Sequence, residues 1–125
     1  MSIWTTDELL RIADAVELRV ASRRADGTLR PYVTIWHVGV GAALYIRSAR
    51  GPGNGWFRRA EQAGVGRISA GGVERDVTFE PAPADVREAV DAAYHAKYDR
   101  YGAAPVGAVT GPDVLETTLR VVPRD

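Results

Sequence analysis

The sequence has 125 residues, 16 basic against 16 acidic side chains, and no cysteine. This length fits a single domain spanning residues 1–125, able to bury a core without covalent staples. The charge balance argues against general nucleic-acid binding, for which a clearly basic domain is expected. The absence of cysteine excludes disulfides, thiolate nucleophiles and cysteine-based zinc sites.

The chain carries no signal that would place it in or across a membrane. No run approaches the ~20 apolar residues of a membrane-spanning helix. The first ten residues contain Asp7 and Glu8 and no basic flank, unlike a signal peptide. We therefore expect a cytoplasmic protein with neither nucleic-acid nor membrane partners.

The first predicted elements are a helix and a pair of strands. The segment TTDELLRIADA at 5–15 offers a threonine cap and acidic residues near the positive end of a helix dipole. Residues 17–24 alternate with the period of two that is typical of a strand. Asp26-Gly27 is a strong hairpin signal. The segment 29–38 is rich in β-branched and aromatic residues, as a return strand would be.

The later elements follow in the same way from periodicity and turn residues. A third strand precedes a loop and a helix that carries Trp56, and a second hairpin turns at Gly71-Gly72. The remaining predictions are a strand at 43–48, the hairpin over 65–82, a helix over 83–101, a loop over 102–113 and a last strand over 114–124.

The order of elements predicts the fold class. Strands joined by tight hairpins form an antiparallel sheet, and six strands leave little room for a second sheet. We expect a mainly β fold with helices (α+β): a six-stranded antiparallel closed or split β-barrel with helices packed around it, which removes exposed edges. The alternative is an open sheet with helices on one face, an α+β sandwich.

The chain offers few groups that could carry out chemistry unaided. Its two histidines, His37 and His95, lie in no metal-ligand motif, so we expect no metal. Ser69 in GRISAGG lacks a nucleophile elbow, and GPGNGW lacks the G-x-G-x-x-G spacing. An enzyme with so few acid–base groups would depend on a bound cofactor.

The stretch RSARGPGNGWFRRA, Arg47 to Ala60, is the strongest candidate for a binding site. A helix N-terminus presents free N–H groups to a phosphate, glycines allow close approach, and Trp56 could stack on a flat ring. Arginines at 47, 50, 58 and 59 could add charge-assisted contacts. The alternative is that Trp56 anchors the helix in the core, Gly and Pro only make the turn, and the arginines are solvated.

Further candidates lie on other elements. Tyr32, Thr34 and Trp36 share one face of a strand, where they could line a pocket or belong to the barrel core. Their neighbour Arg30 could meet a phosphate or a surface carboxylate. In the helical segment YHAKY, Tyr98 could help cover a pocket, although a helix with a polar outer face explains most of this pattern.

Two segments resemble a known superfamily. DGTLRPYVTIWHVGVGAALYIRS, Asp26 to Ser48, is similar to the second and third strands of the pyridoxamine 5′-phosphate oxidase-like split barrels. RSARGPGNGWFRRAEQAGVGRIS, Arg47 to Ser69, is similar to a segment of the deazaflavin-dependent nitroreductase branch. Asn54-Gly55 stands where that branch often has Asn-Pro, and arginine replaces the lysine that many FMN-binding members have after the third strand.

Nearly the whole chain resembles the bacterial domain-of-unknown-function family 2255. The resemblance rests on four short words of sequence: Arg50-Gly51-Pro52, Trp56-Phe57, Gly64 to Gly72, and Ala93 to Tyr98.

The resemblance implies a split barrel, usually a homodimer, that binds a cofactor between its subunits. By position, the implied cofactor-binding residues are Arg47, Ser48, Arg50, Gly51, Asn54, Trp56 and Arg59. Tyr32, Thr34 and Trp36 would face the ring or substrate, with Tyr98 nearby.

The implied function is that of an oxidoreductase with FMN or a deazaflavin of the F420 type, acting on a small organic substrate. The alternatives are a non-redox ligand-binding protein, a cofactor-independent enzyme of secondary metabolism, and a structural or regulatory dimer without a ligand. In these three alternatives no flavin or deazaflavin cofactor would be bound.

Overall fold

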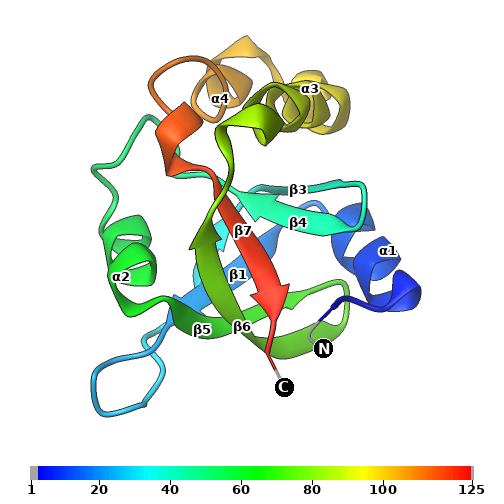
Figure 1. Cartoon of the computed structure of the whole chain (residues 1–125). Helices are drawn as coiled ribbons and strands as arrows, with labels where there is room; N and C mark the ends of the chain where they lie inside the picture. Colours follow the sequence, from blue (N-terminus) through cyan, green and yellow to red (C-terminus); the bar gives the residue numbers. More distant parts are fainter. Residues whose placement is uncertain (1–2, 125) are drawn as a thin grey trace.

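A computed structural model describes residues 3–124 of the chain and shows a nearly closed antiparallel barrel surrounded by helices (Figure 1). The strands are β1 (Leu18–Ser22), β2 (Val33–Ile35), β3 (His37–Val40), β4 (Ala43–Ile46), β5 (Val65–Ala70), β6 (Val73–Pro81) and β7 (Leu119–Pro123). The α-helices are α1 (Thr6–Asp14), α2 (Gly55–Ala63), α3 (Arg87–Tyr98) and α4 (Ala103–Gly107).

The return strand of the first hairpin explains both the closure of the barrel and the strand count. It is divided at Trp36: β2 pairs with β1, whereas β3 pairs with β4. Since β2 and β3 are the two ends of the order β2-β1-β5-β6-β7-β4-β3, one bent segment joins both edges of the sheet. The predicted split barrel is confirmed, with seven strands in the described residues instead of six, and the open sandwich is wrong.

The second hairpin turns at Gly71-Gly72 as predicted, with Ala70 opposite Val73. Gly71 has φ +57°, and a Cβ at this position would lie 2.1 Å from the carbonyl oxygen of Arg11 in α1. Only glycine meets both conditions, because other residues are strained at positive φ and would also strike the helix backbone.

The last strand is shorter than predicted, since 115–117 forms a turn of 3-10 helix before β7. The hydroxyl of Thr117 donates to the carbonyl of Val114, at 2.7 Å, and the hydroxyl of Thr118 donates to that of Leu115, at 2.8 Å. Such local side-chain bonds to the backbone compete with the hydrogen bonds of a strand. The period-two pattern of the sequence does not reveal them.

The first helix begins with the expected cap. Glu8 N–H donates to the Thr5 hydroxyl at 3.1 Å, and Thr5 N–H donates to the Glu8 carboxylate at 3.0 Å, which completes a capping box. Arg75 of β6 donates to the same carboxylate at 3.1 Å. The Thr5 N–H, followed by Arg75, lowers the pKa of Glu8 below its usual value despite opposing desolvation. These contacts fix α1 against the barrel.

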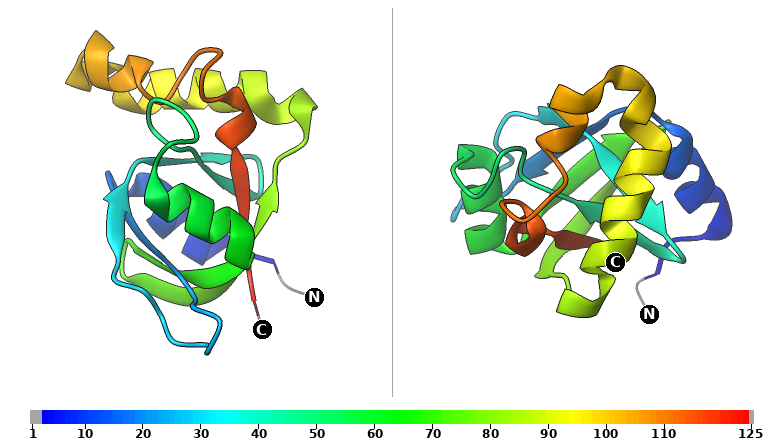
Figure 2. Two further views of the ribbon diagram at one scale, coloured as in Figure 1. Left: turned by 90° about the vertical axis from the view of Figure 1, so that its left-hand side faces the viewer. Right: turned by 90° about the horizontal axis from the view of Figure 1, so that it is seen from above.

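Two apolar clusters organise the molecule. The first fills the barrel between the sheet, α1 and α2, with Ile12, Leu18, Leu44, Ile46 and Ile68 fully buried. In the second, α3 and α4 pack against β3 and β4. The helix α3 is shorter than the helix predicted over 83–101. Figure 2 shows α3 and α4 together across one end of the barrel. None of the helices within 3–124 is both long and apolar enough to span a membrane.

His37 is fully buried where α1, β3 and α3 meet. Its Nε2 lies 2.5 Å from the carbonyl oxygen of Ile12, and that oxygen can only accept, so Nε2 carries the hydrogen. Nδ1 is then a buried lone pair with no donor among the described residues. The Lys97 ammonium lies 3.3 Å from Nε2. Burial first, and then Lys97, lowers the pKa of His37 to about 4.

We expect His37 to make folding stability depend on pH. Its pKa falls from 6.5 when unfolded to about 4 when folded, so the unfolded chain binds the extra proton between these values. The stabilisation is fully present above pH 6.5 and is lost as pH falls toward 4, by up to about 3 kcal/mol. Urea unfolding at several pH values, comparing the wild type with His37→Gln, measures it. Parallel stability curves for the two proteins would contradict this role.

Candidate functional site

A pocket of about 480 Å³ opens beside the loop that joins β4 to α2. One wall is formed by Arg47, Ala49, Arg50, Asn54 and Trp56. A second wall is β2 with Trp36, and Pro105, Ala108 and Val109 in and after α4 contribute a third. The volume lies within the range of small-molecule sites. The candidate RSARGPGNGWFRRA stretch thus lines a cavity that also receives side chains from distant segments.

The loop itself is held by bonds between three predicted site residues. The buried Ser48 hydroxyl donates to the carbonyl of Gly51 at 2.5 Å. The Asn54 amide donates to the Ser48 hydroxyl at 3.0 Å and to the carbonyl of Ala49 at 2.8 Å. These side chains shape the loop, and Asn54 makes no side-chain cap to α2. Both side chains are thus bonded within the loop, and Asn54 also lines the pocket whereas Ser48 does not.

Arg47 requires a correction, because it is only 1% exposed. Its Nε donates to the Thr118 hydroxyl at 2.9 Å, and Nη1 pairs with the Asp91 carboxylate. Nη1 also donates to the carbonyl of Val109, and Nη2 to that of Arg87, both at 3.0 Å. The guanidinium is therefore committed to joining β4, α3 and the segment after α4. All three guanidinium nitrogens are bonded within the protein, unlike the free phosphate ligand that the resemblance implies.

Arg50 is the cation of the loop that stays available. Its side chain is exposed, lines the pocket, and has no hydrogen-bond or ion-pair partner within 3–124. Its φ of +65° makes it the one non-glycine residue in the described part of the chain with positive φ. Its N–H donates to the carbonyl of Ala108 at 2.6 Å, which holds this backbone in place. Unfavourable backbone geometry of this kind often accompanies a functional site.

Two indole rings flank the pocket. Trp56 in the first turn of α2 is half-buried, packs against the barrel core and also lines the pocket. Trp36 stacks on Tyr98 with centroids 4.0 Å apart and an interplanar angle of 6°. This stack fixes the orientation of the Trp36 ring at the edge of the pocket.

Tyr98 also requires a correction, because it is fully buried and does not line the pocket. Its hydroxyl donates to the carbonyl of Val16 at 2.6 Å and accepts from the N–H of His37 at 3.1 Å. Burial raises its pKa to about 12. Tyr98 therefore acts from behind the site, as the support of Trp36.

The predicted trio on the return strand is separated. Thr34 and Trp36 line the pocket, and neither is part of the buried core. Tyr32 lies before β2 begins, and its hydroxyl donates to the Glu74 carboxylate at 2.9 Å. Burial, followed by Glu74, raises the pKa of Tyr32. Tyr32 is therefore not among the residues that line this pocket.

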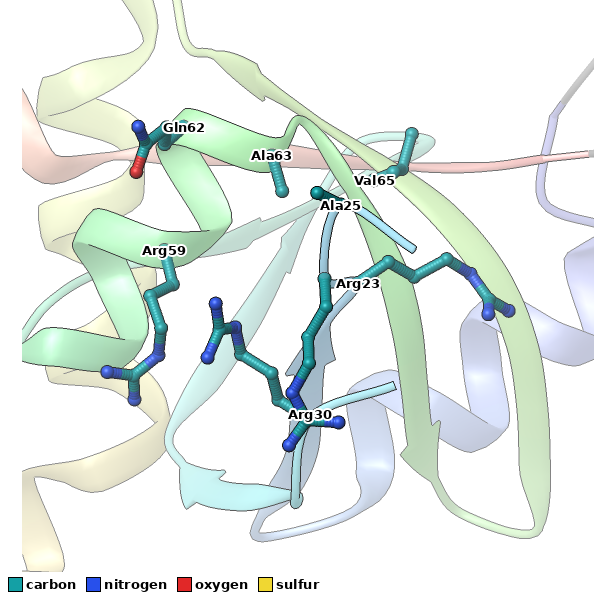
Figure 3. A pocket seen from close by; sticks show the side chains of 8 residues that line it. Arg23, Ala25, Arg30, Arg59, Gln62, Ala63 and Val65 are labelled. Atoms are coloured by element: carbon teal, nitrogen blue, oxygen red, sulfur yellow. The ribbon is translucent and has the colours of Figure 1, made fainter. Parts of the chain in front are cut away.

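One predicted site residue, Arg59, lies outside the pocket, and three residues that were not predicted lie in its lining. Arg59 of α2 does not line this pocket; it lines a second cavity together with Arg30 of the first hairpin (Figure 3). Glu17, Pro105 and Ala108 do line the pocket. No local motif marks these three, since only the folded topology brings them beside the loop. In the described residues, no group of three or more His, Asp or Glu side chains could hold a metal.

The nearly closed barrel, the bent return strand and the pocket beside the β4–α2 loop define a split β-barrel protein. Solved structures support this class. A candidate pyridoxamine 5′-phosphate oxidase from Listeria innocua has a TM-score of 0.63 at 11% identity, covering 94% of this chain and 90% of its own. A candidate 5-nitroimidazole antibiotic resistance protein from Bacteroides thetaiotaomicron has a TM-score of 0.62 at 14% identity, covering 100% and 82%. An F420 reductase has a TM-score of 0.51 at 17% identity, covering 92% and 90%.

The chain belongs to the family described as an uncharacterized protein conserved in bacteria (DUF2255), whose model matches residues 8–121. No curated protein matches the chain. At identities of 11%, 14% and 17%, the structural likeness establishes the fold.

Proposed function

We propose that this protein is an oxidoreductase that uses a flavin or a deazaflavin on a small organic substrate. The observation that supports it most is the pocket of about 480 Å³ that combines indole rings with the free cation Arg50. The relatives named above include a pyridoxamine 5′-phosphate oxidase candidate and an F420 reductase, which supports the same class of cofactor. The ordinary location of such an enzyme is the cytoplasm.

The lining of the pocket fits a flat, partly apolar ring. Val33, Ile35 and Trp56 present apolar surface, and Trp36 is held in one orientation by its stack on Tyr98. A ring placed there would contact these apolar and aromatic groups, as is typical of cofactor sites. When bound, the cofactor would supply hydride transfer, and the chain would hold and orient it.

The charged end of the cofactor would lie against Arg50. An arginine can bind a phosphate through two parallel charge-assisted hydrogen bonds. Arg50 faces the pocket near the N-terminus of α2, where unpaired N–H groups and the helix dipole also favour an anion. Glu17 is the carboxylic acid in the pocket lining and is exposed, so it is the candidate to exchange a proton with the substrate.

A second copy of the chain would complete the site, as the resemblance to split barrels implies. The pocket is bounded by β2, an end strand of the sheet, and by half-buried Trp36. A partner packed along this side would cover a bound ring that the single chain leaves open to water. We therefore include a homodimer in the proposal.

A non-redox ligand-binding protein is the second candidate. The observation that favours it is the commitment of Arg47, Ser48 and Asn54 to contacts within the protein. This leaves Arg50 as the cation for a cofactor phosphate. A small acidic or aromatic ligand would need no more than one cationic side chain.

Replacing Arg50 by asparagine tests the proposal. Asparagine tolerates positive φ, so the loop keeps its shape while the cation is lost. We expect about tenfold weaker binding of FMN or deazaflavin, since a hydrogen bond to a charged group contributes about 1.5–3 kcal/mol. Titration followed by near-ultraviolet and visible absorption measures the affinity.

The matched control is Arg58→Asn, which removes an exposed positive charge from the same region without touching the pocket. Its affinity should stay near that of the wild type. Equal weakening in both variants would contradict a specific role for Arg50. Binding of a small acid in place of either cofactor would support the second candidate.

A further inference from the structure

A second cavity, of about 410 Å³, lies between the first hairpin and the C-terminal half of α2. We call it the arginine groove, defined by Arg23, Arg24, Arg30 and Arg59 with Gln62 at its rim. Figure 3 shows the side chains of Arg30 and Arg59 extending into the space between the hairpin and α2. None of the described residues that line it is acidic.

The positive charges of the groove are only partly balanced. Arg23 pairs with Asp76 at 2.8 Å, but Asp76 is shared with Arg67, at 3.0 Å. Arg24 donates to the carbonyl of Leu29 at 3.0 Å, and Asp26 nearby balances part of its charge. The paired arginines thus shape the hairpin side of the groove.

The other two arginines are free to bind. The Nε–H of Arg30 is buried without a hydrogen-bond partner in the described residues. Arg59 is exposed and has no hydrogen-bond or ion-pair partner within 3–124. The partial negative charge at the end of α2 is only about half a unit and is outweighed by two full charges. An anion that accepts from Arg30 and Arg59 would satisfy both.

The groove is separate from the cofactor pocket. A third cavity, of only about 10 Å³, shares Arg30 and Arg59 with the groove and Val33 and Trp56 with the pocket. That space holds about one water molecule and no ring. A ligand in the arginine groove would therefore bind independently of a ring in the pocket.

We propose that the arginine groove binds a small ligand that carries at least two negative charges, in the form of a phosphate ester or diphosphate. Arg30 would bind from the hairpin side through its Nη groups, and Arg59 would approach from α2. Guanidinium groups match phosphate oxygens in this two-point geometry. A phosphoryl group carries about −1.5 to −2 charges, close to the free charge of the two arginines.

Isothermal calorimetry of the full chain with inorganic pyrophosphate, without any flavin, tests the proposal. We expect binding, stronger than that of inorganic phosphate. Arg59→Ala should weaken it about tenfold, through loss of one charge-assisted contact. Arg30→Lys should weaken it by a similar factor, because lysine keeps the charge but lacks the planar fork. Circular dichroism verifies the fold of each variant.

Arg58→Ala is the control, since Arg58 is exposed on the same helix and lies outside the groove. It should change pyrophosphate affinity by less than about twofold. If citrate binds as tightly as pyrophosphate, the groove is an anion site for a carboxylate ligand, and the assignment to a phosphate ligand is overturned. Absence of pyrophosphate and citrate binding, or equal losses for Arg58→Ala and Arg59→Ala, would overturn the proposal. Neither result would bear on flavin binding in the other pocket.

Discussion

Arg47→Met is expected to lower the free energy of unfolding by about 3–5 kcal/mol, the usual cost of breaking a buried ion pair from one side. Methionine fills much of the same space but donates no hydrogen bond. The variant would remove the Arg47 donor from the Asp91 carboxylate, the Thr118 hydroxyl and two backbone carbonyls. Because native domains have only about 5–15 kcal/mol of stability, this is a large share.

Asp91 helps to show where this energy comes from. Its side chain is 29% exposed, whereas that of Arg47 is fully buried. Water can therefore reach the carboxylate left behind by Arg47→Met, but not the cation left behind by Asp91→Ala. Both variants should be strongly destabilised, and Arg58→Met should stay within about 0.5 kcal/mol of wild type, as an exposed residue does.

Denaturant unfolding at neutral pH measures these free energies. A loss below about 1 kcal/mol for Arg47→Met would mean that the Arg47 network contributes little net stability. That outcome would reopen Arg47 as a ligand-binding residue. A large loss with unchanged ligand affinity in the folded fraction would confirm its structural role.

Gly66→Ala is the second substitution with a large expected effect. A Cβ at Gly66 in β5 would lie 2.0 Å from the carbonyl oxygen of Ala21 in β1 and 2.8 Å from the ring of Phe79. Backbone cannot yield as the end of a flexible side chain can, so β1 and β5 would have to separate. We expect a loss of about 3 kcal/mol or more, or failure to fold.

Gly53→Ala provides the comparison, because a Cβ there meets nothing within 4 Å. It should be neutral, or stabilise by up to about 1 kcal/mol by restricting the unfolded chain. Thermal unfolding of both variants measures the difference. Similar melting temperatures would show that β1 and β5 can part without cost and would contradict the close approach.

The fold could be predicted because its signals are local. The capping box at Thr5, the turns at Asp26-Gly27 and Gly71-Gly72, and the period-two segments each depend on neighbouring residues. The division of the return strand at Trp36 could not be predicted this way, because it depends on which strands lie at the two ends of the sheet.

The site was predicted less completely, for a related reason. The position of RSARGPGNGWFRRA was useful, but residue type did not distinguish buried Arg47 from available Arg50 or from Arg59 on the other side of α2. Burial of an arginine depends on partners far along the chain, here Asp91 and Thr118. Sequence spacing carries no information about those contacts.

The most direct test of the proposed function is co-elution of the wild-type chain with a cofactor. The protein is mixed in turn with FMN and with deazaflavin, separated by gel filtration, and the absorption of the protein peak is recorded. We predict that one of the two cofactors elutes with the protein at the position of a dimer. Elution of the protein free of both cofactors, at concentrations that saturate known split-barrel enzymes, would contradict the proposal.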